Sequence, residues 1–424
     1  MRNSASIASE GHTRVKRTIR YARRHFTEIL QGGISVLLRK LLASLYFFSI
    51  TFLLPLVLLV RVMRPIVLVR FGALRSERLG HFTVNTEAYL CQRDLGIQDR
   101  QAIDIFFHSA PICNQQLKTM WDRTLHVSRL AKGLDRLSRM LPGGYAHVVP
   151  MPTDRDIHPI IGLTSVHLGF TTEEESLGRA ALLELGIDDN TPFVCFHTRD
   201  SAYLATMHPD RDWSYHDYRD SSIQDYLAAA ESLTQRGYHA IRMGDNVREA
   251  LNVDNPSIID YPFKGRSAFM DVYLLAKCRF LLASTSGVAG ISQIFRVPLA
   301  VVNAIPLEYN PAGAQDIYIP KKLWLRRENR LMTFREILDS GASRFLHSEE
   351  YQELGIELVD NSPDEITALA IEMDERLNNT WEITQEDEYL QQSYWSLFDP
   401  SHLCYSSASR IGADFLRRNR DLLN

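Results

Sequence analysis

Short apolar segments alternate with helical segments in the second half of the chain, and this alternation restricts the fold more than any other feature. Buried strands are predicted at residues 193–197, 239–243, 257–261, 280–283 and 299–302. Helices are predicted beside them, at residues 173–185, 223–236, 268–277 and 287–295. Strands that alternate with helices of this length form a parallel sheet with helices on both faces. The sequence therefore predicts an α/β fold with a Rossmann-like domain here.

A smaller and less regular Rossmann-like domain is predicted before it. Residues 66–71 (IVLVRF) and 102–107 are expected to be strands, and residues 114–141 are expected to be helical. A chain of 424 residues has room for two domains and appended segments. We predict a basic arm and hydrophobic membrane segment at residues 1–63, followed by an N-terminal Rossmann-like (acceptor) domain at residues 64–175. A C-terminal Rossmann-like (donor) domain is predicted at residues 176–375, and a helical tail that packs across both domains at residues 376–424.

The run Leu41–Val60 contains no charge over 20 residues, about the length that crosses the hydrocarbon core of a bilayer. Residues 1–40 carry nine Lys or Arg against two Asp or Glu, although the whole chain has a net charge of -4. A basic arm fits nucleic acid or anionic lipid; the adjoining apolar run favours lipid, so we expect a membrane partner and no nucleic acid. Basic residues flank both ends of the run, and Pro55 interrupts it. A segment that dips into one leaflet is therefore predicted, with a full span and a buried helical hairpin as alternatives.

Ser284, Thr285, Ser286 and Gly287 stand between a predicted strand and a predicted helix. The first amides of a helix are unpaired and carry partial positive charge, which suits a phosphate group. A simple helix cap is the alternative interpretation. Because ligands of parallel sheets lie at the carboxyl ends of the strands, we predict that these residues bind the phosphates of a donor.

His197, Thr198, Arg199 and Asp200 form a second polar cluster at the end of an apolar strand. Arg199 is expected to hold a diphosphate, and His197 or Asp200 to orient a sugar or to hold Arg199. The alternative is an ion pair that only fixes the following loop.

Further residues are predicted to bind the donor. Arg242 and Asp245 follow another strand, where one charge suits phosphate and the other suits ribose hydroxyls. Lys264 follows the next strand, where it and Arg266 can close over the anion, and a solvated loop is the alternative for both.

The first loop of the N-terminal domain contains four charged or polar candidates. Arg75 and Arg78 are predicted on the acceptor side of the site. A reaction in which an acceptor hydroxyl attacks a donor needs a base to deprotonate that hydroxyl, and Glu77 or His81 can serve, with Asp200 as the third catalytic candidate. His81 as a helix-capping or merely polar residue is the alternative.

Several motifs are missing from the sequence. Two Asp-Arg-Asp triplets occur, at residues 154–156 and 210–212, but neither directly ends an apolar run, so we recognise no DxD motif of the kind that holds a divalent metal against a nucleotide. HExxH, GxSxG and a spaced Cys/His cluster are absent. The five cysteines are scattered singly, which is typical of a reducing compartment. We therefore expect neither a metal nor a cofactor, and Arg, Lys and helix ends must neutralise the donor.

The order of motifs resembles a family of bacterial glycosyltransferases associated with surface-polysaccharide clusters. The resemblance covers most of residues 66–420 and is carried by VLVRFGALRSERLGHFTVNTEAYLC, FVCFHTRDSAYL, YRDSSIQDYLAAAESLTQRGYHAIRMGD, FLLASTSGVAGISQIFRVPLAVVNAIPL and RIGADFLRRNRDLL. It implies a GT-B fold with two Rossmann-like domains. More distantly, the HTRD and STSG segments look like the donor-binding places of heptosyltransferases and fucosyltransferases.

The resemblance implies transfer of a sugar from a nucleotide-sugar donor to a lipid-linked or polysaccharide acceptor. Nucleotide sugars are made in the cytoplasm, so the cytoplasmic face of the bacterial inner membrane is the expected location. A pyruvyl or phosphoryl transferase of the same fold is one alternative. A membrane-tethered assembly factor without activity is the other.

Overall fold

The computed structural model describes Glu28 and residues 34–42, 45, 48–152, 159–189, 191–200, 212–245, 247 and 249–424. The basic arm predicted at the N-terminus lies mostly outside these residues. The chain forms two compact units. Unit 1 comprises Met1–Gly72, Gln101–Ile105 and Ser128–Val149, and unit 2 comprises Ala73–Arg100, Phe106–Val127 and Pro150–Asn424.

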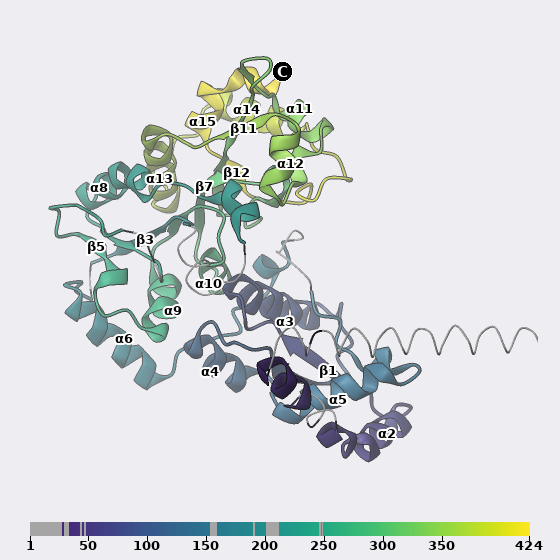
Figure 1. The fold of residues 1–424 in the computed structure, drawn as a ribbon. Coiled ribbons are helices and arrows are strands. Elements are labelled where there is room, and N and C mark those ends of the chain that lie inside the picture. The colour runs from purple at the N-terminus through teal and green to yellow at the C-terminus, as the bar shows by residue number, and fades with distance from the viewer. Residues whose placement is uncertain are drawn as a thin grey trace, which may run out of the picture. The chain divides into compact units, whose positions relative to one another are not determined.

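Unit 2 is built on a parallel sheet of seven strands in the order β12-β8-β7-β6-β3-β4-β5 (Figure 1). The strands are β3 (Phe193–His197), β4 (His239–Arg242), β5 (Ile258–Asp260), β6 (Leu281–Ala283), β7 (Leu299–Ala304), β8 (Ile317–Pro320) and β12 (Arg410–Ile411). Every residue of β3, β6 and β7 is buried, as expected for strands covered on both faces. The predicted α/β fold with a parallel sheet is confirmed.

Helices cover both faces of this sheet. On one face α8 (Leu227–Gln235) packs against α13 (Pro363–Leu377), and on the other α9 (Ala268–Lys277) packs against α10 (Ala289–Ile294) (Figure 1). A capping box between Ser362 and Glu365 starts α13. The remaining helices of unit 2 are α3 (Thr86–Asp94), α4 (Gln115–Thr124), α6 (Thr172–Glu184), α11 (Phe334–Asp339), α12 (Ser348–Glu353), α14 (Gln385–Trp395) and α15 (Ala413–Arg418).

The strand order reverses between β3 and β6. From β3 the chain continues to β4 and β5 on one side, and from β6 it continues to β7 and β8 on the other. The loops after β3 and β6 therefore diverge and leave a crevice at the carboxyl ends of these two strands. The HTRD and STSG segments are those two loops.

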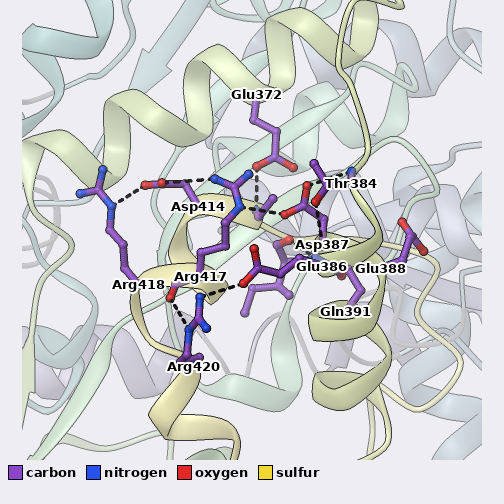
Figure 2. A network of polar contacts seen from close by, with 12 residues as sticks. Glu372, Thr384, Glu386, Asp387, Glu388, Gln391, Asp414, Arg417, Arg418 and Arg420 are labelled. Carbon is purple, nitrogen blue, oxygen red and sulfur yellow. Dashed lines mark hydrogen bonds and ion pairs between the residues drawn. The ribbon is translucent and has the colours of Figure 1, made fainter.

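A second sheet and the C-terminal helices complete unit 2. The antiparallel strands β9 (Lys322–Leu325), β10 (Arg330–Leu331) and β11 (Ile356–Val359) pair in the order β10-β9-β11. Acidic side chains at the start of α14 pair with basic side chains at the end of the chain, as in Arg417 Nε to Asp387 Oδ1 at 2.8 Å and Arg420 Nη2 to Glu386 Oε1 at 2.8 Å (Figure 2). Asp387 also caps α14 through Thr384, so one carboxylate both starts the helix and holds α15.

The first part of the chain has little sheet. Among the described residues its strands are β1 (Val69–Leu74) and β2 (Ile103–His108), which pair with each other. A buried ion pair joins them, because Arg70 Nε and Nη2 each lie 2.7 Å from an oxygen of Asp104. The strand β1 starts three residues later than predicted, since the chain still turns through residues 64–66.

Among the described residues of unit 1, the helices α2 (Leu54–Met63) and α5 (Arg129–Met140) pack against each other, and residues 34–42 are also helical. The predicted helix at residues 114–141 is two helices, because Ser128 starts a new one with its side chain accepting from the Leu130 amide. Within the described part of the chain, no helix combines the length and the apolar character needed to cross a bilayer.

Candidate functional site

A cavity of about 590 Å³ opens at the crevice between β3 and β6. Every residue that lines it belongs to unit 2. Of the residues predicted from the sequence, it is lined by Glu77, Arg78, His81, His197, Arg199, Asp200, Asp245, Arg266, Ser284, Thr285, Ser286 and Gly287. Its volume lies within the range of small-molecule sites.

The loops after β3 and β6 are fixed to each other. The Arg199 amide donates to Ser284 Oγ at 2.9 Å, and the Ser284 amide donates to the His197 carbonyl at 3.2 Å. Thr285 Oγ1 accepts from the Ile305 amide at 3.3 Å. Ser286 differs, because its buried Oγ has no partner among the described residues. The hydroxyls of Ser284 and Thr285 therefore shape the loop, and that of Ser286 remains to meet a ligand.

One terminal nitrogen of Arg199 is hydrogen-bonded to the protein, and the other has no partner among the described residues. Its Nη1 donates to the His216 carbonyl at 2.8 Å and to the Asp220 carboxylate. Its Nη2 is buried and has no hydrogen-bond partner within the described residues. Leaving a charged donor buried and unpaired is costly. The side chain is thus oriented by the protein and lacks an acceptor where it lines the cavity.

Positive charge is concentrated around His216. Burial, followed by the charges of Arg219, Arg199 and Arg78, lowers the pKa of His216 to about 3. The Arg78 guanidinium also lies 5.5 Å from the centre of the Trp213 ring. Burial raises the pKa of Asp220 to about 6, against the effect of Arg199. The charges of three guanidiniums therefore meet at His216, on a wall that suits a polyanion. Asp220 itself does not line the cavity, whereas the carboxyl groups of Glu77, Asp200, Asp245 and Asp271 do.

His197 is neutral and has a defined tautomer. Burial lowers its pKa to about 4. Its Nδ1 lies 3.0 Å from the Met243 carbonyl, which can only accept, so Nδ1 carries the proton. The Nε2 atom is consequently an acceptor, able to bind a hydroxyl group but not to attract a phosphate by charge.

Of the residues predicted after the neighbouring strands, Asp245 and Arg266 line the cavity, whereas Arg242 and Lys264 do not. Asp245 lines the cavity and pairs with Arg266 Nη1 at 2.7 Å. Arg242 does not line it, because Nη1 is turned to the Glu249 carbonyl at 2.7 Å and to Asp260 of β5 at 3.2 Å. Lys264 is exposed and also lies outside the lining.

The loop after β1 lines the same cavity, and glycines allow it to pack close to the start of α10. A Cβ on Gly287 would lie 3.0 Å from the Gly80 amide nitrogen, and a Cβ on Gly290 would lie 2.4 Å from Thr83 Oγ1. Only glycine allows α10 to approach the short π-helical turn η1 (His81–Asn85) this closely. The structure therefore brings the loop at residues 77–81 into the lining with the donor loops.

The candidate bases and the acceptor-side residues of that loop differ in whether they line the cavity and in their partners. Glu77 lines the cavity, with Oε1 3.8 Å from Arg75 Nε, whereas its buried Oε2 has no hydrogen-bond partner among the described residues. His81 and Arg78 line the cavity as well. Arg75 does not, and its side chain is half exposed.

Some lining residues were not predicted. They are mainly residues 111–114 after β2, 309–312 after β7, and His216 and Asp271. Residues 309–312 follow a strand of the parallel sheet, so the carboxyl-end rule would have found them. His216 gave no local signal, since it follows a long loop.

One cluster of potential metal ligands occurs in the described part of the chain, outside the cavity lining. It consists of Glu87, Cys91 and His167, whose ligand atoms lie within 4.8 Å of one another. Arg296 Nη2 lies 2.7 Å from Glu87 Oε1, and His167 Nδ1 lies 2.9 Å from the same oxygen. A guanidinium thus already neutralises the carboxylate that a cation would need. The prediction of a reaction without a metal stays a prediction.

Comparisons with known proteins gave similar structures only. No protein-family model matches the sequence, and the search of curated proteins found no match. A glycosyl transferase of family 9 from Veillonella parvula is 12% identical with a TM-score of 0.38, covering 60% of this chain and 86% of its own. ADP-heptose LPS heptosyltransferase II from E. coli is 14% identical with a TM-score of 0.34, covering 67% and 98%. An iron-containing dodecameric glycosyltransferase from enterotoxigenic E. coli is 12% identical with a TM-score of 0.29, covering 56% and 59%.

The solved structures that this chain resembles are thus family 9 glycosyltransferases and heptosyltransferases. A heptosyltransferase is thus among the similar structures, as the distant likeness in the sequence predicts. Because the TM-scores are below 0.5, the comparison identifies neither a donor nor an acceptor.

Proposed function

We propose that this protein is a glycosyltransferase of the GT-B type. It moves a sugar from a nucleotide-activated donor to a lipid-linked or surface-polysaccharide acceptor, at the cytoplasmic face of the bacterial inner membrane. The observation that carries the proposal is Arg199, which lines a cavity at the reversal of strand order and whose buried Nη2 has no partner among the described residues.

The donor's diphosphate accounts for the positive wall of the cavity. Arg199 is oriented by Asp220 and His216, so little side-chain entropy is lost when it binds an anion. Arg78 and Arg219 add charge close by, as the low pKa of His216 indicates. Three guanidiniums can stabilise a leaving diphosphate, which supports a reaction that needs no metal. Ser286 Oγ and His197 Nε2 supply a neutral donor and acceptor for hydroxyl groups.

Glu77 is the best supported of the three candidate bases. Its unpaired Oε2 is free to take the proton of the acceptor hydroxyl as that oxygen attacks the anomeric carbon. The bond from the anomeric carbon to the donor phosphate breaks in the same step, and the electron pair leaves with the diphosphate. His81 and Asp200 line the cavity and remain alternatives.

The first test is a thermal-shift panel of nucleoside diphosphates and nucleotide sugars on the full chain. A ligand that binds only the folded state raises the melting temperature. At a concentration of 100 times its Kd it adds about 2.7 kcal/mol to the free energy of unfolding. We expect one nucleoside diphosphate and its sugars to do so. Ser286→Ala should keep the unliganded melting temperature, because its hydroxyl has no partner to lose, and should weaken the shift.

Arg199→Lys should reduce the shift further, since lysine keeps the charge but has no second nitrogen with which to bind the donor while the first binds Asp220 and His216. Arg326 is exposed in the turn that follows β9, so Arg326→Lys is the matched control and should leave the shift unchanged. No shift with any nucleotide would contradict the proposal in favour of an assembly factor or a donor without a nucleotide. A shift with nucleotide but transfer of a pyruvyl or phosphoryl group would identify the other transferase class.

A further inference from the structure

The helix α2 is docked on α5 within unit 1. The apolar run does not continue as one helix into α2, because the chain turns at Phe52 and Leu53 before Pro55. Val57 and Val60 of α2 are buried. The approach to α5 is close, since a Cβ on Gly133 would lie 2.7 Å from Leu53 Cδ1. One side of α2 is therefore fixed to the protein.

The other side of α2 is apolar and exposed. The side chains of Leu58, Leu59 and Val62 are 48%, 53% and 76% exposed, and Phe52 just before the helix is 73% exposed. An apolar stripe of this kind on a folded unit marks a binding surface. The helix has 10 residues, which corresponds to about 15 Å and half of the hydrocarbon core.

The adjacent helix α5 presents a row of basic side chains. Arg129, Lys132, Arg136 and Arg139 are exposed, and their spacing of three, four and three residues places them on one face of the helix. Gly133, which meets the α2 segment, lies next to this face. Leu130, Met140 and Tyr145 are 59%, 58% and 70% exposed at its ends, and the Arg139 guanidinium lies 5.8 Å from the centre of the Tyr145 ring.

We propose that the exposed sides of α2 and α5 form one surface that binds a bilayer with anionic headgroups. The apolar side chains of α2 enter the boundary of the acyl chains, and the α5 row meets the lipid phosphates. Charge complementarity selects lipid over a second copy of the chain, because the α5 rows of two copies would repel each other. In this arrangement α2 lies parallel to the membrane. The inference does not depend on the transferase reaction.

The test is co-flotation of the full chain with vesicles of phosphatidylcholine, with and without 30% phosphatidylglycerol, at about 0.1 M salt. Replacing Arg129, Lys132 and Arg136 with Gln removes three charges from the surface. Each basic residue contributes roughly a fivefold gain in binding to anionic membranes, so partitioning should fall about 100-fold. The matched control replaces the exposed Arg326, Arg327 and Arg335 of unit 2 with Gln and has the same net charge. If the two triple variants bind alike, the α5 row has no role and the proposal fails.

Orientation is tested separately with nitroxide labels at Phe52→Cys and Val62→Cys, two exposed positions at opposite ends of the segment. A helix parallel to the membrane gives both labels nearly the same depth. Depths that differ by about 15 Å would overturn the parallel arrangement. Light scattering without lipid tests whether a second copy of the chain binds this surface instead. If the chain self-associates, and if Leu58→Gln and Val62→Gln each abolish the self-association but leave vesicle binding intact, the surface belongs to a second copy and the proposal fails.

Discussion

Individual side chains in the cavity were predictable from the sequence where they end a strand. Arg199 and Ser286 were found in this way, because parallel strands present their carboxyl ends at one edge. Arg242 satisfies the same rule, yet it binds Asp260, which the register of β4 and β5 places directly beside it. Pairing between neighbouring strands is a tertiary property, so the sequence pattern at one strand end cannot predict it.

Glu77→Gln tests the proposed base. The substitution keeps size and one acceptor oxygen but cannot take a proton at neutral pH, so we expect turnover to fall by about 10² to 10⁴. The donor-induced rise in melting temperature should persist, because Glu77 is not a predicted donor ligand. Unchanged turnover in Glu77→Gln would transfer the role to His81 or Asp200, and the corresponding variants would then be compared.

His167 gives stability a dependence on pH. Contacts with Cys91 and Glu87 raise its pKa to about 10 from the ordinary 6.5, and Asp94 lies 3.0 Å from its Nε2. A raised pKa means that the folded state binds the proton more tightly. This stabilisation is therefore complete below pH 6.5 and is lost as the pH rises to about 10.

The corresponding variant is His167→Gln. It should cost about 1–3 kcal/mol at pH 6, since Glu87 loses a buried partner but keeps Arg296. The difference from the unmodified chain should shrink toward pH 10, as followed by chemical unfolding across this range. A difference that is constant with pH would mean that His167 is not protonated in the folded state.

At the scale of elements, the fully buried segments were predicted best. The bounds of β3 and α9 agree with the sequence prediction at both ends, because continuous apolar runs between polar loops leave few alternatives. The strands β8 to β12 were not predicted, although every residue of β8 is buried. The residues of β9, β10 and β11 are mostly half-exposed, so these three strands lack the apolar run of the central strands.

The contact between α10 and η1 also depends on elements rather than on single residues. Gly290→Ala places a methyl group 2.4 Å from Thr83 Oγ1 and should destabilise the fold by about 1–3 kcal/mol through overpacking. Thr83→Ala in the same chain removes that oxygen and should recover part of the loss. Gly162→Ala, with open space around it, is the matched control for chemical unfolding. Additive effects of the two substitutions would show that the contact is not made.

At the scale of the whole molecule, the two units share the chain in alternation. Unit 1 takes residues from three separate segments, the last of which ends at Val149. Sequence patterns predict elements in the order of the chain and carry no signal for which of them return to an earlier unit. The C-terminal part of unit 2 was predictable because its strands and helices follow one another without such returns.

This alternation has a consequence for how such a gene can change. A recombination event with one breakpoint exchanges everything before or after a single codon, and no breakpoint separates units whose segments are interleaved. Any crossover between codons 72 and 150 would leave part of one unit inherited from each parent. The surface proposed on α2 and α5 draws on two of the three segments of unit 1, so no single crossover exchanges this surface whole without also exchanging part or all of unit 2.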